Sequence, residues 1–130
     1  MVIQRKKTII EIKSEAFAGR IIKLNSFLKK EKKEQIISKQ LYRCGTSIGA
    51  NIAESRYAQS DADFVSKLQI ALKEANETCY WIICLRNAEL LDEKGYQSIY
   101  HDAEELVKIL ISSIKTKKEN MLKNNLNIKV

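Results

Sequence analysis

Apolar residues recur at helical spacing along most of the chain and predict four helices. The expected helices cover residues 8–30, 34–57, 60–91 and 96–117, followed by a basic tail over about 118–130 that is expected to fray. The third helix begins with "SDAD", a capping-box pattern, and "DEKG" supplies the last turn, which ends at Gly95. Four helices with short connections favour an all-α, antiparallel up-down-up-down four-helix bundle, formed by a single domain over residues 1–130.

The second expected helix carries two glycines that need an explanation. In "RCGTSIGANIAES", residues 43–55, Gly45 and Gly49 lie one helical turn apart. Each costs about 0.5 to 1 kcal/mol in a helix interior relative to alanine, so a neighbour must approach this backbone closely. We interpret the two glycines as admitting a helix of another subunit. The alternative is a bulky neighbour inside the same bundle.

The third expected helix has apolar residues on two nearly opposite sides. One stripe faces the core, and the second combines Ile70, Trp81 and Cys84 with two glutamates. A helix of this kind needs neighbours on both sides, so a second subunit is expected to cover the second and third helices in a homo-oligomer. The residues assigned to oligomer packing are Arg43, Gly45, Gly49, Ala53, Glu54, Ile70, Glu74, Glu77 and Trp81.

The two glutamates of this second stripe, Glu74 and Glu77, would be penalised by burial if they stayed unpaired. Arg43 and Arg56 are the two arginines on the second helix. We therefore expect one of these arginines to meet one of the glutamates, within the subunit or across the interface.

Charge is distributed unevenly along the sequence. The net charge is +7; residues 1–56 carry 13 Lys or Arg against 5 Asp or Glu, residues 57–114 carry 5 against 10, and residues 115–130 carry 5 against 1. The two ends are therefore basic and the middle is acidic. A basic pole of this kind either binds a polyanion or is only a solvated surface.

The candidate nucleic-acid contacts are the basic residues that flank the first and fourth helices. They are Arg5, Lys6, Lys7, Lys29, Lys30, Lys32, Lys33, Lys115, Lys117 and Lys118. In an antiparallel bundle the start of the first helix and the end of the fourth share a pole, so their charges add. Phosphate contacts would give salt-dependent, sequence-tolerant binding to RNA or DNA. No aromatic platform interleaves with these lysines, which argues against base-specific readout of single strands.

The sequence offers no catalytic or metal site. A carboxylate di-metal bundle needs Glu-x-x-His motifs, but the single histidine, His101, is followed by "DAEE" and is expected on the surface of the fourth helix. The hydroxyls and thiol near residue 45 have no histidine nearby in sequence, and no glycine-rich phosphate loop is present. We therefore predict a protein that is not an enzyme and that binds no metal or cofactor.

The chain also lacks targeting signals. No apolar run approaches the roughly 20 residues needed to span a bilayer, and the N-terminal segment lacks the apolar core of a signal peptide. Cys44, Cys79 and Cys84 form no CxxC motif, which suits buried thiols in a reducing compartment. A cytoplasmic protein without a membrane partner is expected.

Residues 40–82, "QLYRCGTSIGANIAESRYAQSDADFVSKLQIALKEANETCYWI", closely resemble the signature of a four-helix-bundle family named for proteins encoded in 23S rRNA intervening sequences. The family also includes accessory variability proteins of diversity-generating retroelements. Its motif usually reads R-S-G-T-S-I-G-A-N-I-A-E-G, so Cys44 replaces a serine and Ser55 a glycine. The resemblance implies a four-helix bundle, ring-like homopentamers and no catalytic residues. For the retroelement members it further implies a basic surface that binds nucleic acid and a reverse transcriptase partner.

Together these patterns predict a non-enzymatic, oligomeric accessory protein that binds RNA or DNA, with a reverse transcriptase or another ribonucleoprotein as a candidate partner. The alternative is a structural or scaffolding homo-oligomer that binds a protein partner and has no role with nucleic acid. Salt-sensitive binding separates the two.

Overall fold

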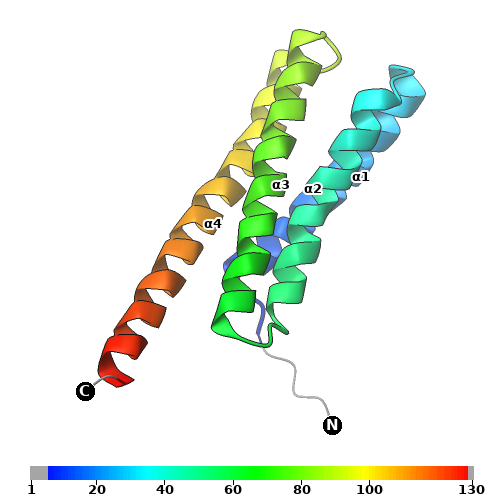
Figure 1. Cartoon of the computed structure of the whole chain (residues 1–130). Coiled ribbons are helices and arrows are strands. Elements are labelled where there is room, and N and C mark those ends of the chain that lie inside the picture. Colours follow the sequence, from blue (N-terminus) through cyan, green and yellow to red (C-terminus); the bar gives the residue numbers. More distant parts are fainter. Residues whose placement is uncertain (1–5, 129–130) are drawn as a thin grey trace.

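The computed structural model describes residues 6–128, which form four α-helices: α1 (Ile9–Glu31), α2 (Ile36–Ser55), α3 (Asp61–Asn87) and α4 (Glu93–Ile128). The helices run alternately up and down (Figure 1). α1 packs on α2, α2 on α3 and α3 on α4, while the contact between α1 and α4 is the smallest. The predicted all-α, antiparallel four-helix bundle is thereby confirmed. None of these helices, over the described residues, has the length and apolar character needed to cross a membrane.

Side-chain caps fix the starts of the helices. The Thr8 hydroxyl accepts from the Glu11 N–H and the Glu11 carboxylate accepts from the Thr8 N–H, which completes a capping box before α1. Ser60 caps α3 as predicted, because its hydroxyl accepts from the Asp63 N–H at 3.0 Å. The Glu34 carboxylate accepts from three N–H groups at the start of α2, so this helix begins two residues later than expected.

The end of α3 differs from the prediction, which extended this helix to about residue 91. Glu89 adopts a left-handed conformation with φ of 59°. Its N–H donates to the Arg86 carbonyl and the Leu90 N–H donates to the Leu85 carbonyl, both at 2.9 Å. This pattern is a Schellman motif, which stops the helix at Asn87. The left-handed position of this motif is usually occupied by glycine or asparagine. A glutamate at that position therefore does not indicate a helix end in the sequence.

Both ends of α4 were also placed incorrectly. The Asp92 carboxylate accepts from the Gly95 N–H at 2.6 Å, so Gly95 lies in the first turn of α4 and does not end the preceding turn. The tail expected to fray from residue 118 is helical through Ile128. Figure 1 shows these last turns projecting past the α2–α3 turn. At 1.5 Å per residue, the helix continues about 16 Å beyond Lys117.

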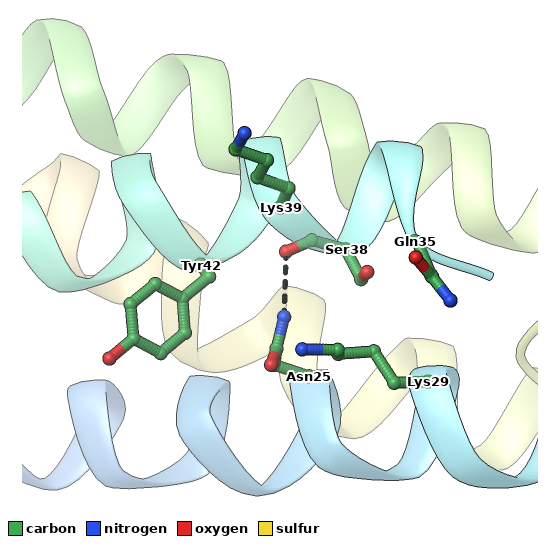
Figure 2. Close-up of a pocket in the computed structure, with 6 residues that line it drawn as sticks. All are labelled: Asn25, Lys29, Gln35, Ser38, Lys39 and Tyr42. Atoms are coloured by element: carbon green, nitrogen blue, oxygen red, sulfur yellow. Dashed lines mark hydrogen bonds between the residues drawn. The ribbon is translucent and has the colours of Figure 1, made fainter.

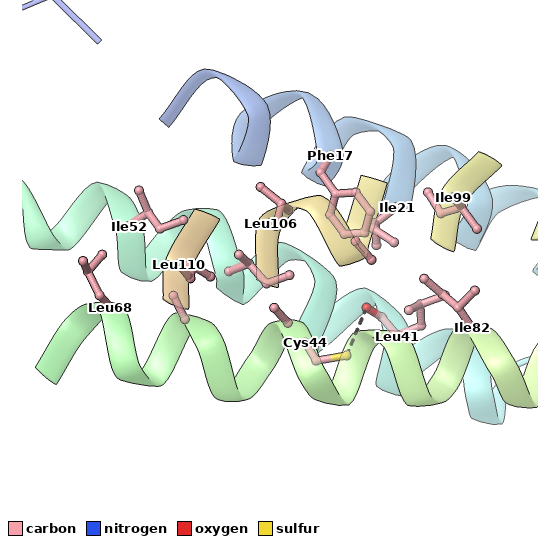
Figure 3. Close-up of a cluster of buried hydrophobic side chains, with 14 of the residues drawn as sticks. Phe17, Ile21, Leu41, Cys44, Ile52, Leu68, Ile82, Ile99, Leu106 and Leu110 are labelled. Atoms are coloured by element: carbon pink, nitrogen blue, oxygen red, sulfur yellow. Dashed lines mark hydrogen bonds between the residues drawn. The ribbon is translucent and has the colours of Figure 1, made fainter. Parts of the chain in front are cut away.

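All four helices contribute to one core, part of which is shown in Figure 3. Its fully buried large side chains are Phe17, Ile21, Leu28, Leu41, Ile48, Ile52, Ile82, Leu85, Leu106 and Leu110. The apolar side chains Leu41, Ile48 and Ile52 of α2 therefore point inward. On α1, by contrast, Ile9, Ile12 and Ile22 are exposed although they are apolar.

The two glycines of α2 face α1 of the same chain. A Cβ at Gly45 would lie 2.8 Å from Ile21 Cγ1, and a Cβ at Gly49 would lie 3.3 Å from the Ser14 carbonyl oxygen. Both distances are shorter than ordinary carbon contacts. The interpretation that Gly45 and Gly49 admit another subunit is therefore wrong, and the alternative of a close neighbour within the bundle is correct.

We predict that Gly45→Ala lowers the free energy of unfolding by up to about 2 kcal/mol. Overpacking against Ile21, which is fully buried, costs about 1 to 3 kcal/mol, and the higher helix propensity of alanine returns about 1 kcal/mol. Urea denaturation at a fixed protein concentration measures the difference.

Gly19→Ala is the matched control, because a Cβ at Gly19 meets nothing within 4 Å. This substitution should stabilise the protein by about 0.5 to 1 kcal/mol. If Gly45→Ala and Gly19→Ala raise the free energy of unfolding equally, α1 does not constrain position 45.

Candidate functional site

A charged network joins α2 to α3 on the outside of the bundle. Arg43 Nη1 lies 3.2 Å from Glu74 Oε2, and Arg43 Nη2 donates to Glu77. The Trp81 indole N–H also donates to Glu77, at 3.2 Å. The predicted pairing of Arg43 with these glutamates is confirmed, and it forms within one chain. Arg56 instead lies 3.5 Å from Glu11, where it joins the end of α2 to the start of α1.

The network holds Glu77 in its charged form. Burial alone would raise the pKa of Glu77, but hydrogen bonds from Trp81 and Arg43 outweigh it and lower the pKa below the ordinary 4.5. The hydrogen bond with Glu77 also raises the pKa of Arg43. Both partners are therefore ionised at neutral pH.

Two of the three cysteines are protonated at neutral pH. Burial raises the pKa of Cys44 and of Cys79 to about 11. The Thr78 hydroxyl donates to Cys44 Sγ at 3.3 Å and to the Glu74 carbonyl at 2.7 Å. Because the thiolate is the nucleophilic form of cysteine, these two thiols are unreactive packing groups.

The residues assigned to oligomer packing do not lie on a single face. Gly45 and Gly49 face α1 inside the chain. Ala53, one turn after Gly49 on α2, is exposed. The remainder lie along the junction of α2 and α3, which we call the α2–α3 face and which consists of Arg43, Glu54, Ile70, Glu74, Glu77 and Trp81. Glu54 pairs across this junction with Lys67 at 3.4 Å. Ile70 is exposed and Trp81 is half-buried, so part of this face is apolar surface open to solvent.

A dense cluster of positive charge lies at the turn between α1 and α2, where four lysines surround one exposed carboxylate, Glu31. Lys29, Lys30, Lys32 and Lys33 are all exposed, and none forms an ion pair with any residue in the described range. The nearby Glu34 carboxylate is held at the start of α2, where it accepts from the Ile36, Ile37 and Ser38 N–H groups at 2.8 to 3.1 Å. We call this segment, residues 29–33, the lysine turn.

The opposite pole carries the remaining predicted contacts, and much of its charge is neutralised. Lys7 pairs with Glu15 at 2.6 Å, and Lys117 pairs with Asp61 at 2.9 Å while lying over the Phe64 ring. The latter pair confirms that the start of α1 and this part of α4 share a pole, because Asp61 begins α3 directly after α2. Lys6, Lys115 and Lys118 form no ion pair among residues 6–128. Arg5 lies outside the described residues.

Aromatic rings do lie beside the lysines, contrary to the expectation from sequence. Tyr42 on α2 lines the same groove as Lys29 and Lys39 (Figure 2). The Lys32 ammonium also lies 6.0 Å from the centroid of the Phe27 ring. The proximity of Tyr42 to Lys29 was not predicted, because the two residues belong to different helices.

No cluster of metal ligands is found in the part of the chain that the structure describes. Over residues 6–128 no group of three or more His, Cys, Asp or Glu side chains is arranged to hold a metal ion. His101 is exposed on α4, as predicted, and its nearest acidic partner is Asp102, at 3.7 Å.

Comparisons with known proteins agree on one family. The family described as 23S rRNA-intervening sequence protein matches residues 6–112. A crystal structure of a protein with unknown function from the S23 ribosomal protein family of Bacteroides thetaiotaomicron VPI-5482 is 53% identical, with a TM-score of 0.82, and the match covers 82% of this chain and 99% of that one. No curated protein matches the sequence. The lysine turn and the α2–α3 face lie inside the matched range, whereas Lys115, Lys117 and Lys118 lie beyond it.

We predict that Glu77→Gln flattens the acid side of the stability profile. The folded pKa of Glu77 lies below its ordinary value, so its contribution is present above pH 4.5 and is lost as the pH falls through the lower folded pKa. Urea denaturation between pH 7 and pH 3 should therefore show a smaller loss of stability in Glu77→Gln than in the unsubstituted protein.

The exposed Glu119 supplies the control, because it forms no ion pair with the residues described here. The Glu119→Gln profile should follow that of the unsubstituted protein. If the Glu77→Gln profile does so as well, the network does not hold Glu77 charged.

Proposed function

The chain belongs to the family of 23S rRNA-intervening sequence proteins, and from this membership and its distribution of charge we propose that it is a non-enzymatic, oligomeric accessory protein that binds RNA or DNA in the cytoplasm. The lysine turn is the principal contact in this proposal. Lys6, Lys115 and Lys118 at the other pole add to it.

The observation that carries the proposal is the excess of positive charge at the lysine turn, where four lysines surround one carboxylate, Glu31. Four exposed ammonium groups lie within five residues, without ion pairs to the described part of the chain. Lys39 adds a fifth on the next turn of α2. Side chains of this kind release counterions from a phosphate backbone and bind it with little dependence on sequence.

Assembly would strengthen this interaction. In the proposal, copies of the chain meet through the α2–α3 face, whose exposed Ile70 and half-buried Trp81 surround a charged network that is already satisfied within each chain. Covering this face therefore leaves no unpaired charge at the network. A ring, as the family resemblance suggests, would present several lysine turns to one nucleic acid and raise its affinity by multivalency. The proposed partner is a reverse transcriptase or another protein of a ribonucleoprotein complex.

A scaffold that binds a protein partner is the second candidate. It is favoured by the exposed apolar side chains of α4, namely Ile111, Leu122 and Leu126. In that case the lysine turn contributes only solubility, and binding to nucleic acid is absent even at low salt.

We predict that replacing Lys29, Lys30, Lys32 and Lys33 together with glutamine weakens binding to a DNA duplex and reduces its salt dependence. Each lost phosphate contact removes about 0.9 from the slope of log K against log salt, so the slope should fall by about 3 to 4. Fluorescence anisotropy at several salt concentrations measures both quantities.

The control variant replaces four other lysines with glutamine and so removes the same amount of charge. These lysines are exposed on α3 and α4 and are Lys73, Lys94, Lys108 and Lys123. This variant should retain most of the slope. An equal loss in both variants would show that total charge, and not the lysine turn, determines binding. No binding by the unsubstituted protein at low salt would refute the nucleic-acid function.

We predict that Ile70→Glu dissociates the oligomer. Ile70 is 41% exposed on the α2–α3 face, and a carboxylate there would be buried without a partner in an assembled protein. Sedimentation velocity should show the mass falling towards the 15.0 kDa of one chain. Ile22→Glu on α1, where the isoleucine is 48% exposed, should leave the mass unchanged. Dissociation by Ile22→Glu alone would place the interface on α1.

A further inference from the structure

A polar groove lies beside the lysine turn, between the second half of α1 and the first half of α2 (Figure 2). Its volume is about 490 Å³, within the range of small-molecule sites in proteins. The lining residues are Asn25, Lys29, Gln35, Ser38, Lys39 and Tyr42. One ammonium group, two carboxamides and one aromatic ring thus line a single hollow, with the Lys39 side chain on its rim.

The groove is held open by a direct link between the two helices. The Asn25 side-chain amide donates to the Ser38 carbonyl at 3.0 Å. The Ser38 hydroxyl in turn donates to the Glu34 carbonyl at 3.0 Å. Because these contacts join α1, the turn and α2, the groove is preformed and a ligand would not have to order it.

The cations of the groove are available to a ligand. Lys29 points into the groove towards Asn25 and the Tyr42 ring, whereas Lys39 points outward from its α2 rim (Figure 2). Neither lysine forms an ion pair with a residue between 6 and 128. One ammonium group can therefore meet an anion inside the groove while the other meets a neighbouring anion outside it.

Tyr42 supplies an aromatic surface. Its side chain is 44% exposed and does not belong to the core. The residue lies within α2, so its ring is carried on a regular helix. An exposed ring on a rigid element, beside a cation, is the arrangement on which the bases of single-stranded nucleic acids stack.

A covering protein surface fits this groove less well. The buried centres of protein interfaces are depleted of lysine, and a second copy seated here would have to bury the unpaired Lys29. A duplex also fits poorly, because its bases are stacked on one another and offer no free face. A planar ligand that carries an anion satisfies both the ring and the ammonium group.

We propose that this groove binds one unit of a single-stranded nucleic acid, with the base stacked on Tyr42, its phosphate paired with Lys29 and the next phosphate near Lys39. The inference rests on the proposed nucleic-acid function and adds to it a preference for unpaired strands. It also assigns Tyr42 a role in binding that charge alone does not supply.

The test compares a labelled 20-nucleotide single-stranded RNA with a duplex of the same sequence, at one salt concentration, by anisotropy. Since stacking on one aromatic side chain is worth about 1 to 3 kcal/mol, Tyr42→Ala should weaken single-strand binding by about 5- to 150-fold. Duplex binding should change less than twofold. Tyr42→Phe keeps the ring and should restore most of the affinity.

Tyr57→Ala is the matched control, because Tyr57 is 79% exposed at the opposite pole and should leave single-strand binding unchanged. Lys29→Gln should lower the salt slope by about one, while Tyr42→Ala should leave that slope unaltered. Circular dichroism and sedimentation confirm that each variant is folded and assembled.

The outcomes separate the two proposals. If the unsubstituted protein binds RNA but Tyr42→Ala binds the single strand equally well, the groove inference is wrong and the proposed function stands. If no RNA or duplex binds at low salt, both fail. If Tyr42→Ala changes the oligomer mass instead of the affinity, the groove is covered by another copy of the chain, and the inference is overturned.

Discussion

The close approach of α1 to α2 is the constraint on which the rest of the arrangement depends. Ile21 fills the space that a side chain at position 45 would occupy, so the two helices lie nearer than ordinary side chains would permit. At this separation their polar edges also meet, and Asn25 reaches the Ser38 carbonyl. The helical hairpin is thereby fixed at both its core and its rim. Its turn, which carries the densest positive charge, is presented by a rigid support.

The side of α2 that faces α3 carries different residues from the side that faces α1. Towards α1 the helix presents glycine and packs closely, whereas towards α3 it presents Arg43, a long side chain that reaches Glu74 and Glu77. This division leaves few charges unsatisfied where α2 and α3 meet, and it lets Ile70 and Trp81 form a surface of mixed character beside the network. Such a surface suits a partner that covers it without separating the ions, because breaking a desolvated pair is costlier than covering an intact one.

Much of the fold follows from local sequence, and much of the candidate site does not. Helical periodicity predicted the four helices. The free-energy cost of burying unpaired carboxylates predicted that an arginine such as Arg43 pairs with Glu74 or Glu77. The end of α3 escaped prediction because Glu89 takes a conformation that usually signals glycine. The role of Gly45 was misassigned because a helix projection shows which side is small but not which neighbour lies there. The groove was missed because Tyr42 and Lys29 come together only when two helices pack.

Folding and charge are connected at the lysine turn through Glu34. Three N–H groups at the start of α2 bind its carboxylate, so its negative charge is directed towards the positive end of the helix dipole. A carboxylate held in this way is poorly placed to pair with the lysines that precede it, although it is adjacent to Lys33 in sequence. The interaction that begins α2 therefore also leaves the ammonium groups of the turn facing solvent. The Glu34 cap thus stabilises the start of α2 without pairing with the lysines that a polyanion would contact.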